Sequence, residues 1–582
     1  MSKLRMEDII FGRSLREPGY RVDFAVGTTY SLDLETFISL PFSLGFLEEP
    51  DEVMKQSPTY IFAALRLCSD RLAVFCNFSD IKVPPKDYKV YCALMEGSVF
   101  PVNVTRKDQI VNFHPKVWVV KQTRLEKEES LLRVIVMSRN LTRDGSLDCA
   151  CVLTGKVGSR RASKEAQARH KPLGDFLKFL GKYVSDSKKE RVMELAGDVL
   201  CVERFDVDGP YDDYAFLPMG IRGYSGEDEL KHILWSKKVA VVSPFLDDAT
   251  LRQFDEKRED ALLVTQEMSI SQTAVDVFGK DNIYTMNPGM TDNELEESVD
   301  LHAKMYFSTR WDGGWKNYLY LGSTNATRNG FSSNVEFLMR LRYKRRMMSW
   351  YEFADFFMND PDRRFMKMVD IAEGTGSKME EYQQSLSLRH AIASLIRGEV
   401  VVEDDEKYTI RLTVSGSDPE TEVSPLLRPD LKAALEPGLS FAGLALIELS
   451  KFYVVKTAGL SRVVKIPTEV IPKERDKEIC LRYFISTPDQ FMDCISFLLS
   501  ESKTAYVLSR MSYFMRSGEG VAGMATSSYP AVYENLLREA YESPDTFKDI
   551  KTFVESLPSD VVPPEFDGLY KMIIKAIDGL KG

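Results

Sequence analysis

The sequence contains few cysteines for its length and no apolar run long enough to cross a membrane. Eight cysteines occur in 582 residues, and none belongs to a Cys-x-x-Cys pair, which argues for free thiols in a reducing compartment. No apolar run approaches the roughly 18 residues that a transmembrane helix needs. The first residues also lack the apolar stretch of a signal peptide. We therefore expect a globular protein without a transmembrane segment, located in the cytoplasm.

Histidine is also scarce, yet two of the five histidines begin the same sequence motif. A histidine is followed two places later by a lysine, and then by Ser-x-Asn-x-Thr-Arg-x-Gly. The positions are His114, Lys116, Ser138 and Asn140 in the first copy, and His302, Lys304, Ser323 and Asn325 in the second. The two histidines lie 188 residues apart. This spacing indicates a duplication of domain size, because it is too long for a solenoid repeat.

Passages typical of alternating strands and helices precede and follow each copy. Residues 22–37 and 238–254 each read as a buried strand, a turn and a helix, with Asp33 and Asp247 in the capping positions. Further strands are expected at 70–78, 89–94, 260–266 and 282–286, and helices at 175–184 and 349–357. Alternating strands and helices, twice over, predict an α/β fold with two tandem lobes that form one pseudo-twofold unit.

The length of the chain predicts about three to four domain-sized units. We expect a first lobe over residues 1–208, a second over 209–375 and a C-terminal α+β domain over 376–582. In that domain the apolar segments 409–414, 452–457, 462–467 and 480–486 predict strands, and the last hundred residues predict helices. It carries no recognisable motif, so a role in binding protein partners or nucleic acid is open.

Each copy of the motif spans two apolar strands joined by a polar loop, which predicts a hairpin. A hairpin brings the histidine at the start of one strand and the asparagine at the end of the other to the same end. His114 and Lys116 should also share a face, since side chains two apart in a strand point the same way. Histidine, lysine and asparagine of each half are therefore expected to converge.

Two histidines, two lysines and two asparagines in one place suit attack on phosphorus. Cations and amide donors stabilise the negative charge that develops on the phosphoryl oxygens. One imidazole can attack while the other protonates the leaving group, because a pKa of about 6.5 allows either role at neutral pH. The duplication therefore predicts one active site to which both halves contribute.

The paired His-x-Lys and Ser-x-Asn motifs resemble those of the phospholipase D superfamily, over about residues 20–375. The resemblance implies two lobes around a shared site, a covalent phosphohistidine intermediate, and neither a metal nor another cofactor. By the same analogy His114 is the nucleophile and His302 the general acid, although the sequence itself does not order them.

One departure from the family pattern bears on the substrate. Phospholipases of the superfamily usually carry an aspartate five residues after the motif lysine, where this chain has Lys121 and Thr309. In this respect the chain is similar to the tyrosyl-DNA phosphodiesterases and to bacterial nuclease-like members. The resemblance therefore implies a nucleic acid substrate in preference to a lipid.

The superfamily also uses an acidic or amide residue downstream of the asparagine to orient a histidine. Glu336 and Asp148 are the candidates in the second and first halves. A carboxylate that binds Nδ1 of an imidazole fixes the tautomer, so that Nε2 faces the substrate. The alternative for both residues is an ordinary surface carboxylate.

Six further residues are candidates for substrate binding: Ser138, Ser323, Arg143, Arg328, Trp311 and Trp315. The two arginines could bind a flanking phosphate through their forked donors, or they could cap or pair within the following helix. The two tryptophans lie in the loop of the second hairpin, which we expect beside the site. There they could stack on bases, and packing or loop anchoring is the alternative.

The charge distribution is mixed. The net charge is −11, which argues weakly against a protein coated for nucleic acid. Residues 156–171 carry six Lys or Arg against one Glu, however, and residues 340–346 carry five against none. Two basic clusters shortly after the two motifs favour a nucleic acid partner, and solvated faces are the alternative.

The leading hypothesis is a metal-independent phosphodiesterase, acting as a nuclease or on the ends of DNA or RNA. A phospholipase or phosphatidyl transferase is the second hypothesis. A non-catalytic binding or scaffold subunit is the third, because some 180 residues follow the motif-bearing part. Bacterial relatives often belong to restriction or antiviral systems with helicases, so the resemblance also implies such a setting.

Overall fold

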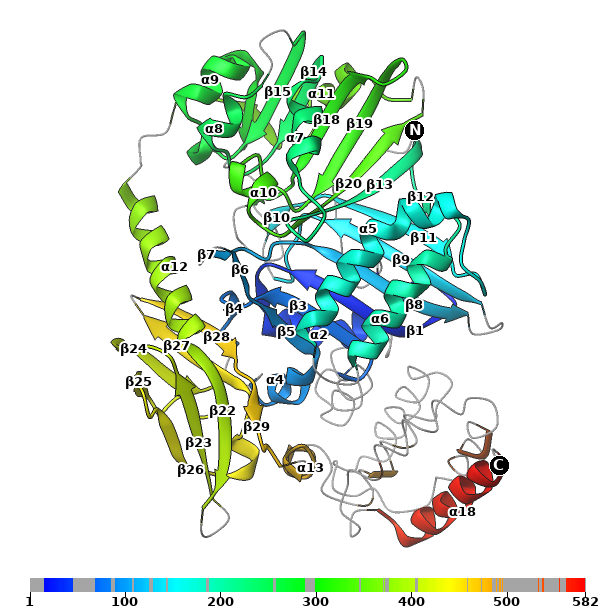
Figure 1. Ribbon diagram of the computed structural model, residues 1–582, viewed down its shortest axis with the longest axis vertical. Helices are drawn as coiled ribbons and strands as arrows, with labels where there is room; N and C mark the ends of the chain where they lie inside the picture. Colours follow the sequence, from blue (N-terminus) through cyan, green and yellow to red (C-terminus); the bar gives the residue numbers. More distant parts are fainter. Residues whose placement is uncertain are drawn as a thin grey trace, which may run out of the picture.

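Two large mixed sheets and a smaller C-terminal part make up the computed structural model of the chain (Figure 1). The predicted α/β class is confirmed. The structure describes residues 15–44, 69–84, 89–106, 109–124, 129–142, 145–184, 188–254, 258–287, 299–344, 347–369, 376–403, 407–457, 459–472, 474–483 and 562–580, with a few short pieces besides. No helix in these ranges is long and apolar enough to cross a membrane.

The first sheet has the strand order β12-β11-β9-β8-β1-β3-β5, and the second has β13-β20-β19-β18-β14-β15-β16-β21. The first consists of β1 (Tyr20–Thr29), β3 (Leu72–Asn77), β5 (Val99–Val102), β8 (Val117–Arg124), β9 (Ser130–Met137), β11 (Ala150–Lys156) and β12 (Asp206–Val207). The second consists of β13 (Tyr211–Met219), β14 (Lys238–Val242), β15 (Asp260–Thr265), β16 (Ile283–Met286), β18 (Met305–Trp311), β19 (Trp315–Gly322), β20 (Glu336–Tyr343) and β21 (Phe365–Lys367).

Six strands of each sheet repeat the same order and directions. β1 runs parallel to β3 and antiparallel to β8, as β14 does to β15 and β18. The hairpins β8–β9 and β18–β19 are antiparallel, and β11 and β20 extend them. The duplicated sequence thus folds into two matching sheets. The chain passes from one sheet to the other between residues 207 and 211, and the domain boundaries at 208 and 375 stay predictions.

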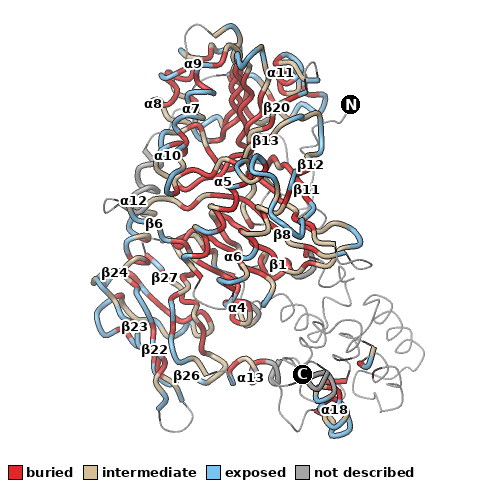
Figure 2. Tube along the Cα trace, turned by 45° about the vertical axis from the view of Figure 1, so that its right-hand side comes forward, coloured by how far each residue is buried: buried red, intermediate tan, exposed pale blue. Residues whose placement is uncertain are grey.

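The strands of both sheets are buried on both faces, as mixed sheets covered on two sides are. In β8, Val117 and Val119 face a core that contains residues of both sheets, whereas Trp118 and Val120 face the opposite side. Figure 2 shows this buried interior running through both sheets. The ring of Phe176 lies 5.0 Å from that of Phe337 in the second sheet. The two halves are therefore joined by one continuous core.

Helices flank the sheets, and two of them begin where the sequence places a capping aspartate. The Asp33 carboxylate accepts the Glu35 N–H at 2.9 Å, and the Asp247 carboxylate accepts the Thr250 N–H at 2.7 Å. The helices of this part are α2 (Leu34–Ser43), α4 (Lys89–Met95), α5 (Lys164–Leu180), α6 (Lys188–Asp198), α7 (Glu227–Leu234), α8 (Asp248–Leu251), α9 (Gln272–Phe278), α10 (Arg328–Ser332) and α11 (Trp350–Met358).

One predicted strand in the first half is wrong. Residues 89–94 belong to helix α4, and the third parallel strand is β5, which begins at Val99. The helix contains Ala, Leu and Met, which favour helices. The valines of β5 are β-branched and pack well on a pleated surface, so the strand forms there.

The C-terminal part begins with α12 (Gly376–Ser394) and continues as a set of strands. They are β22 (Leu395–Val402), β23 (Tyr408–Val414), β24 (Asp418–Pro425), β25 (Ala433–Leu435), β26 (Ser440–Leu444), β27 (Phe452–Thr457), β28 (Leu460–Lys465) and β29 (Thr468–Glu469). One sheet has the order β26-β23-β22-β29. The other has β2-β4-β28-β27-β24-β25, and its β2 (Leu32–Asp33) and β4 (Ile81–Lys82) come from the first half.

The strand predicted at 480–486 is also wrong over its described residues. Helix α13 (Glu474–Tyr483) covers them, and residues 484–486 lie outside the described part. Glu474 and Asp476 in the first turn favour a helix start through the helix dipole. Near the C-terminus the structure describes helix α18 (Pro564–Leu580), in agreement with the helices predicted there.

Candidate active site

The two hairpins bring the motif residues to one end of each sheet. Lys116 directly precedes β8, and Ser138 directly follows its partner β9. Val117 pairs with Val136, so the start of β8 lies beside the end of β9. Met305 pairs with Leu321 in the second hairpin in the same way. The predicted convergence of histidine, lysine and asparagine within each half is therefore what the strand register produces.

Backbone pairing between the halves then joins the two ends. The His114 N–H donates to the Val335 carbonyl at 2.9 Å, and the His302 N–H donates to the Leu147 carbonyl at 3.0 Å. Glu336 follows Val335 in the sequence, and Asp148 follows Leu147. Each pairing therefore presents a carboxylate of one half to the histidine of the other half.

The histidine–carboxylate hydrogen bonds cross between the halves. His114 Nδ1 lies 2.9 Å from Glu336 Oε2, and His302 Nδ1 lies 2.8 Å from Asp148 Oδ1. An ionised carboxylate only accepts hydrogen bonds, so each Nδ1 carries the hydrogen. Nε2 of each neutral ring is then left with a lone pair for a substrate.

The motif serines lie beneath the carboxylates and do not reach the surface. Ser138 Oγ donates to Asp148 Oδ1 at 2.6 Å, and Ser323 Oγ donates to Glu336 Oε2. Both serines are fully buried, and each hydroxyl also accepts a backbone N–H, at 2.9 and 3.0 Å. They are therefore placed to hold the carboxylates, and the predicted contact with a substrate is wrong.

The two motif lysines are buried side chains that meet at the site. Lys116 Nζ donates to the His114 carbonyl at 2.9 Å, and Lys304 Nζ donates to the His302 carbonyl at 2.6 Å. Burial lowers the pKa of Lys116 well below its usual value, and the nearby charge of Lys304 lowers it further. An anion beside both ammonium groups would relieve this repulsion, so the site is suited to a phosphate group.

Burial also keeps both histidines neutral at pH 7. It lowers the pKa of His114 to about 4, with Glu336 opposing the shift and Lys116 adding to it. The pKa of His302 is lowered by burial and by the charge of Lys304, with Asp148 opposing. Burial disfavours the ionised form of Asp148, but His302, Lys304 and the Ser138 hydroxyl outweigh it, and its pKa is lowered. The first-half carboxylate is therefore ionised beside a neutral imidazole.

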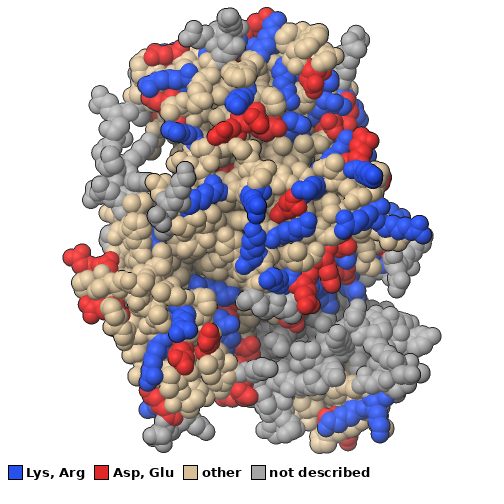
Figure 3. Space-filling view, in the orientation of Figure 1, with Lys and Arg blue, Asp and Glu red and all other residues tan. Residues whose placement is uncertain are grey.

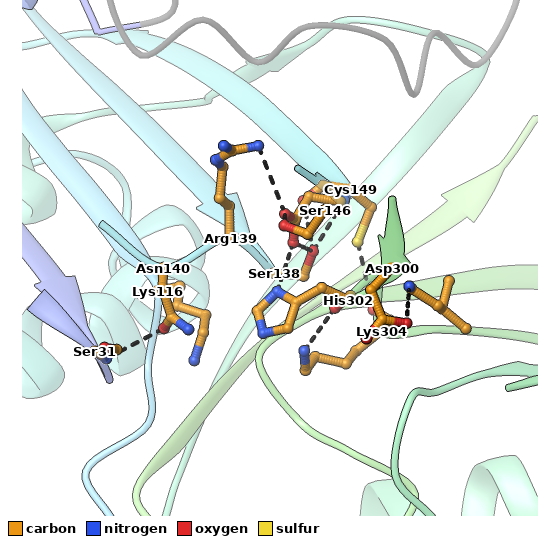
Figure 4. Close-up of polar contacts among 12 residues, drawn as sticks. Ser31, Lys116, Ser138, Arg139, Asn140, Ser146, Cys149, Asp300, His302 and Lys304 are labelled. Carbon is orange, nitrogen blue, oxygen red and sulfur yellow. Dashed lines mark hydrogen bonds and ion pairs between the residues drawn. The ribbon is translucent and has the colours of Figure 1, made fainter. Parts of the chain in front are cut away.

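The motif asparagines complete the constellation. Asn140 Oδ1 accepts the Ser31 N–H at 3.4 Å, which leaves the amide nitrogen available as a donor. Figure 4 shows Asn140 and Lys116 of the first half facing His302 of the second. Asn325 Oδ1 is buried and has no hydrogen-bond partner among the described residues. An amide and an ammonium group of the first half therefore lie beside the imidazole of the second half.

The tryptophans predicted beside the site are at the opposite end of the second hairpin. Trp311 pairs with Trp315 at its tip, whereas Met305 is at the site end. The six intervening steps at about 3.3 Å per residue place the tip about 20 Å away. Their rings pack against each other edge to face, 5.6 Å apart. The predicted position beside the site is wrong because the length of β18 and β19 separates the loop from the site end of the hairpin.

Of the two motif arginines predicted to bind a phosphate, the structure describes Arg328. Arg328 is the first residue of α10, where its backbone N–H donates to Asp247 Oδ2. Thr327 caps this helix by accepting the Gly330 N–H at 3.1 Å. The motif Thr-Arg-x-Gly of the second half is thus a helix start. Arg143 lies outside the described residues.

The basic clusters lie away from the site, and several of their cations are paired with acids. Residues 156–171 follow the far end of β11, and 340–343 are the far end of β20. Arg340 binds Glu229 at 3.0 Å, and Arg342 binds Asp212 at 2.6 Å. In Figure 3 basic and acidic side chains alternate over the face that includes α5 and α6. These clusters therefore do not form a basic surface at the site.

Two site residues were missed although the sequence carries their signal. Ser146 Oγ donates to Asp148 Oδ2 at 2.6 Å, and Asn334 Nδ2 donates to Glu336 Oε1 at 3.1 Å. Both stand two places before the carboxylate, so a polar residue repeats there in the two halves. Among the described residues, no group of three or more His, Cys, Asp or Glu is arranged to hold a metal ion.

Comparison with known proteins gives structural neighbours of low similarity. No protein-family model matches the sequence, and no curated protein matches it. A mutant of yeast tyrosyl-DNA phosphodiesterase is similar at 10% identity and a TM-score of 0.34, with 56% of this chain and 82% of that chain covered. Polyphosphate kinase from Porphyromonas gingivalis is similar at 9% identity and a TM-score of 0.33, with 66% and 50% covered.

A third neighbour is phosphatidylserine synthase from Haemophilus influenzae Rd KW20, at 7% identity and a TM-score of 0.33, with 65% of this chain and 91% of that chain covered. All three neighbours are phospholipase D superfamily members. Each TM-score is low, and the likeness assigns no activity to this chain.

Proposed function

We propose that the chain is a metal-independent phosphodiesterase that acts on nucleic acid through a phosphohistidine intermediate. The observation that carries the proposal is the pair of crossed histidine–carboxylate hydrogen bonds, at 2.9 and 2.8 Å, beside two buried lysines. Two oriented imidazoles with two cations nearby match what the transfer of a phosphoryl group requires.

In the first step His114 Nε2 attacks the phosphorus atom of the diester. The N–P bond forms as the bond from phosphorus to the leaving oxygen breaks, and His302 in its protonated form gives its proton to that oxygen. Lys116 and Lys304 stabilise the charge on the phosphoryl oxygens. Binding the anionic diester raises the pKa of His302, because a nearby negative charge favours the imidazolium.

In the second step water attacks the phosphorus atom of the intermediate. His302, now neutral, takes a proton from the water, and the N–P bond breaks to restore His114. The products are a phosphomonoester and an alcohol. His114 is assigned as the nucleophile because its low pKa, about 4, keeps its lone pair available over the whole neutral range.

The substrate class is inferred from the two positions at which phospholipases carry an aspartate. Lys121 Nζ forms an ion pair with Asp198 at 2.8 Å, and Thr309 Oγ1 donates to Asn317 Oδ1 at 2.8 Å. At both positions, the residue that replaces the aspartate thus forms a contact within its own half of the chain. Because the aspartate is absent from both positions, we infer that the substrate is nucleic acid and not lipid. A place in a restriction or antiviral system remains a prediction from the resemblance.

A substrate panel tests the proposal. Labelled single- and double-stranded DNA and RNA are incubated with the full chain in excess chelator, beside phospholipid vesicles. Cleavage of nucleic acid that His114→Ala and His302→Ala abolish is expected. Turnover of lipid alone would instead assign a phospholipase or phosphatidyl transferase. No turnover of either class would point to the non-catalytic role and overturn the proposal.

A further inference from the structure

The loop that follows β1 contacts the site at two points. The ring of Tyr30 lies 5.0 Å from that of His114, centroid to centroid, and Lys116 Nζ lies 5.8 Å from the centre of the Tyr30 ring. The next residue, Ser31, donates its N–H to Asn140 Oδ1. The position of this short loop therefore affects the histidine, the lysine and the asparagine of the first half.

The C-terminal part holds this loop through a shared sheet. β2, which starts at Leu32, pairs with β4, and Ile81 of β4 pairs with Val463 of β28. Leu32 and Ile81 also share a hydrophobic cluster with Phe452 and Val463. In Figure 1 the short β4 lies where the C-terminal strands meet the first half. The loop thus leads directly into a sheet in which every strand except β2 and β4 comes from residues 418–465.

Two arginines of the C-terminal part reinforce this attachment. Arg389 of α12 donates from Nη2 to the Tyr30 hydroxyl at 2.9 Å. Arg462 of β28 donates from Nε to Asp80 Oδ1 at 2.9 Å, and the Asp80 carbonyl accepts the Leu32 N–H at 3.0 Å. One cation therefore holds the tyrosine itself, and the other holds the backbone behind it.

The second half is different at the corresponding place. The chain after β14 continues as Ser243, Pro244 and Phe245, and Leu246 pairs with Ala326 as Leu32 pairs with Leu141. Ser243 Oγ donates to the Phe245 carbonyl at 2.8 Å. Proline therefore stands where the first half has Tyr30, so the contact to a histidine ring is specific to His114.

We infer that Arg389 is a positioning residue of the active site, acting on His114 through Tyr30. Glu336 fixes Nδ1 of the His114 ring, and Tyr30, held by Arg389, packs against the ring itself. Together they restrict the orientation in which Nε2 approaches phosphorus, which is how positioning groups lower a barrier. The C-terminal part then belongs to the catalytic unit. This inference rests on the proposed function.

The test is a double-mutant cycle of Tyr30→Phe and Arg389→Met in the full chain, assayed on a chromogenic aryl phosphodiester and on an oligonucleotide. Each single variant is expected to lower kcat about five- to thirtyfold, the effect of about one or two kcal/mol, with KM unchanged. The double variant should be no slower than either single variant, because both remove the same hydrogen bond. Arg389→Lys should recover part of the activity, since it keeps a cationic donor.

Arg428→Met is the matched control. Arg428 is an arginine of the same C-terminal part, bound to Asp430 and Glu448, and its loss should leave kcat and KM unchanged. Melting temperatures of all variants show whether they fold.

Three results would overturn the inference: unchanged kcat in Arg389→Met, additive losses in the double variant, or a raised KM for the oligonucleotide alone, which would make Arg389 a substrate contact. If the wild type hydrolyses no phosphodiester, it is the proposed function that fails.

Discussion

Replacing Asp148 with asparagine should move the pH profile of the enzyme. The proposed general acid His302 has a pKa below its usual value because of burial and Lys304, and Asp148 opposes this shift. The profile of kcat/KM reports the free enzyme, so kcat/KM should fall tenfold per pH unit above the pKa of His302. On the acid side it should fall below about pH 4, where His114 becomes protonated.

The size of the change follows from the 2.8 Å contact between His302 Nδ1 and Asp148 Oδ1. Removing an opposite charge at this distance lowers the pKa of the histidine by about one to three units. Asp148→Asn should therefore move the alkaline limb to lower pH by that amount. At pH 7 this is about a ten- to thousandfold loss of kcat/KM, which should shrink as the pH is lowered. Steady-state kinetics from pH 4 to 8 measure it.

Glu336→Gln is the matched control, because it removes the same charge from His114 in the other half. It should leave the alkaline limb in place, because the acid limb that it affects lies at or below pH 4. An alkaline limb that stays put in Asp148→Asn would refute the reasoning. An alkaline limb moved by Glu336→Gln instead would show that the two histidines have the opposite roles.

Three other perturbations have expected outcomes. His302→Ala should still form a phosphoenzyme from an aryl diester with a good leaving group, whereas His114→Ala should form none, as acid-quenched labelling would show; labelling of His114→Ala contradicts the assignment. Ser138→Ala removes a buried hydrogen bond of about 1–3 kcal/mol from Asp148, so kcat should fall at least fivefold, and an unchanged kcat would argue against its supporting role. Arg475 forms an ion pair with the buried Glu96 carboxylate at 2.7 Å. Arg475→Leu removes this partner and should lower the free energy of unfolding, measured in urea, by about 3–5 kcal/mol. A decrease below about 1 kcal/mol would show that Glu96 finds another partner.

Much of the fold and of the site could be predicted from the sequence, because both depend on local patterns. The hairpins follow from apolar runs and polar loops, and their register places lysine and asparagine together without further information. The strand predicted at residues 89–94 is wrong because short apolar runs fit a helix or a strand equally well. The crossing of Glu336 to His114 depends on pairing between the halves, which no local pattern encodes. Arg389 and Tyr30, which form a hydrogen bond, are 359 residues apart in the sequence, and no sequence motif near either residue indicates this contact.

The crossed carboxylates also bear on how such a chain could have arisen. A protein with a single copy of the repeat would hold a histidine and a carboxylate that do not reach each other. Two copies related by a twofold axis would satisfy both pairs at once, since an isologous interface exchanges each contact reciprocally. Such an ancestor would be active only as a homodimer. Fusion of its genes would remove the need to associate and free each copy to change alone, as Tyr30 and Pro244 already differ at one position.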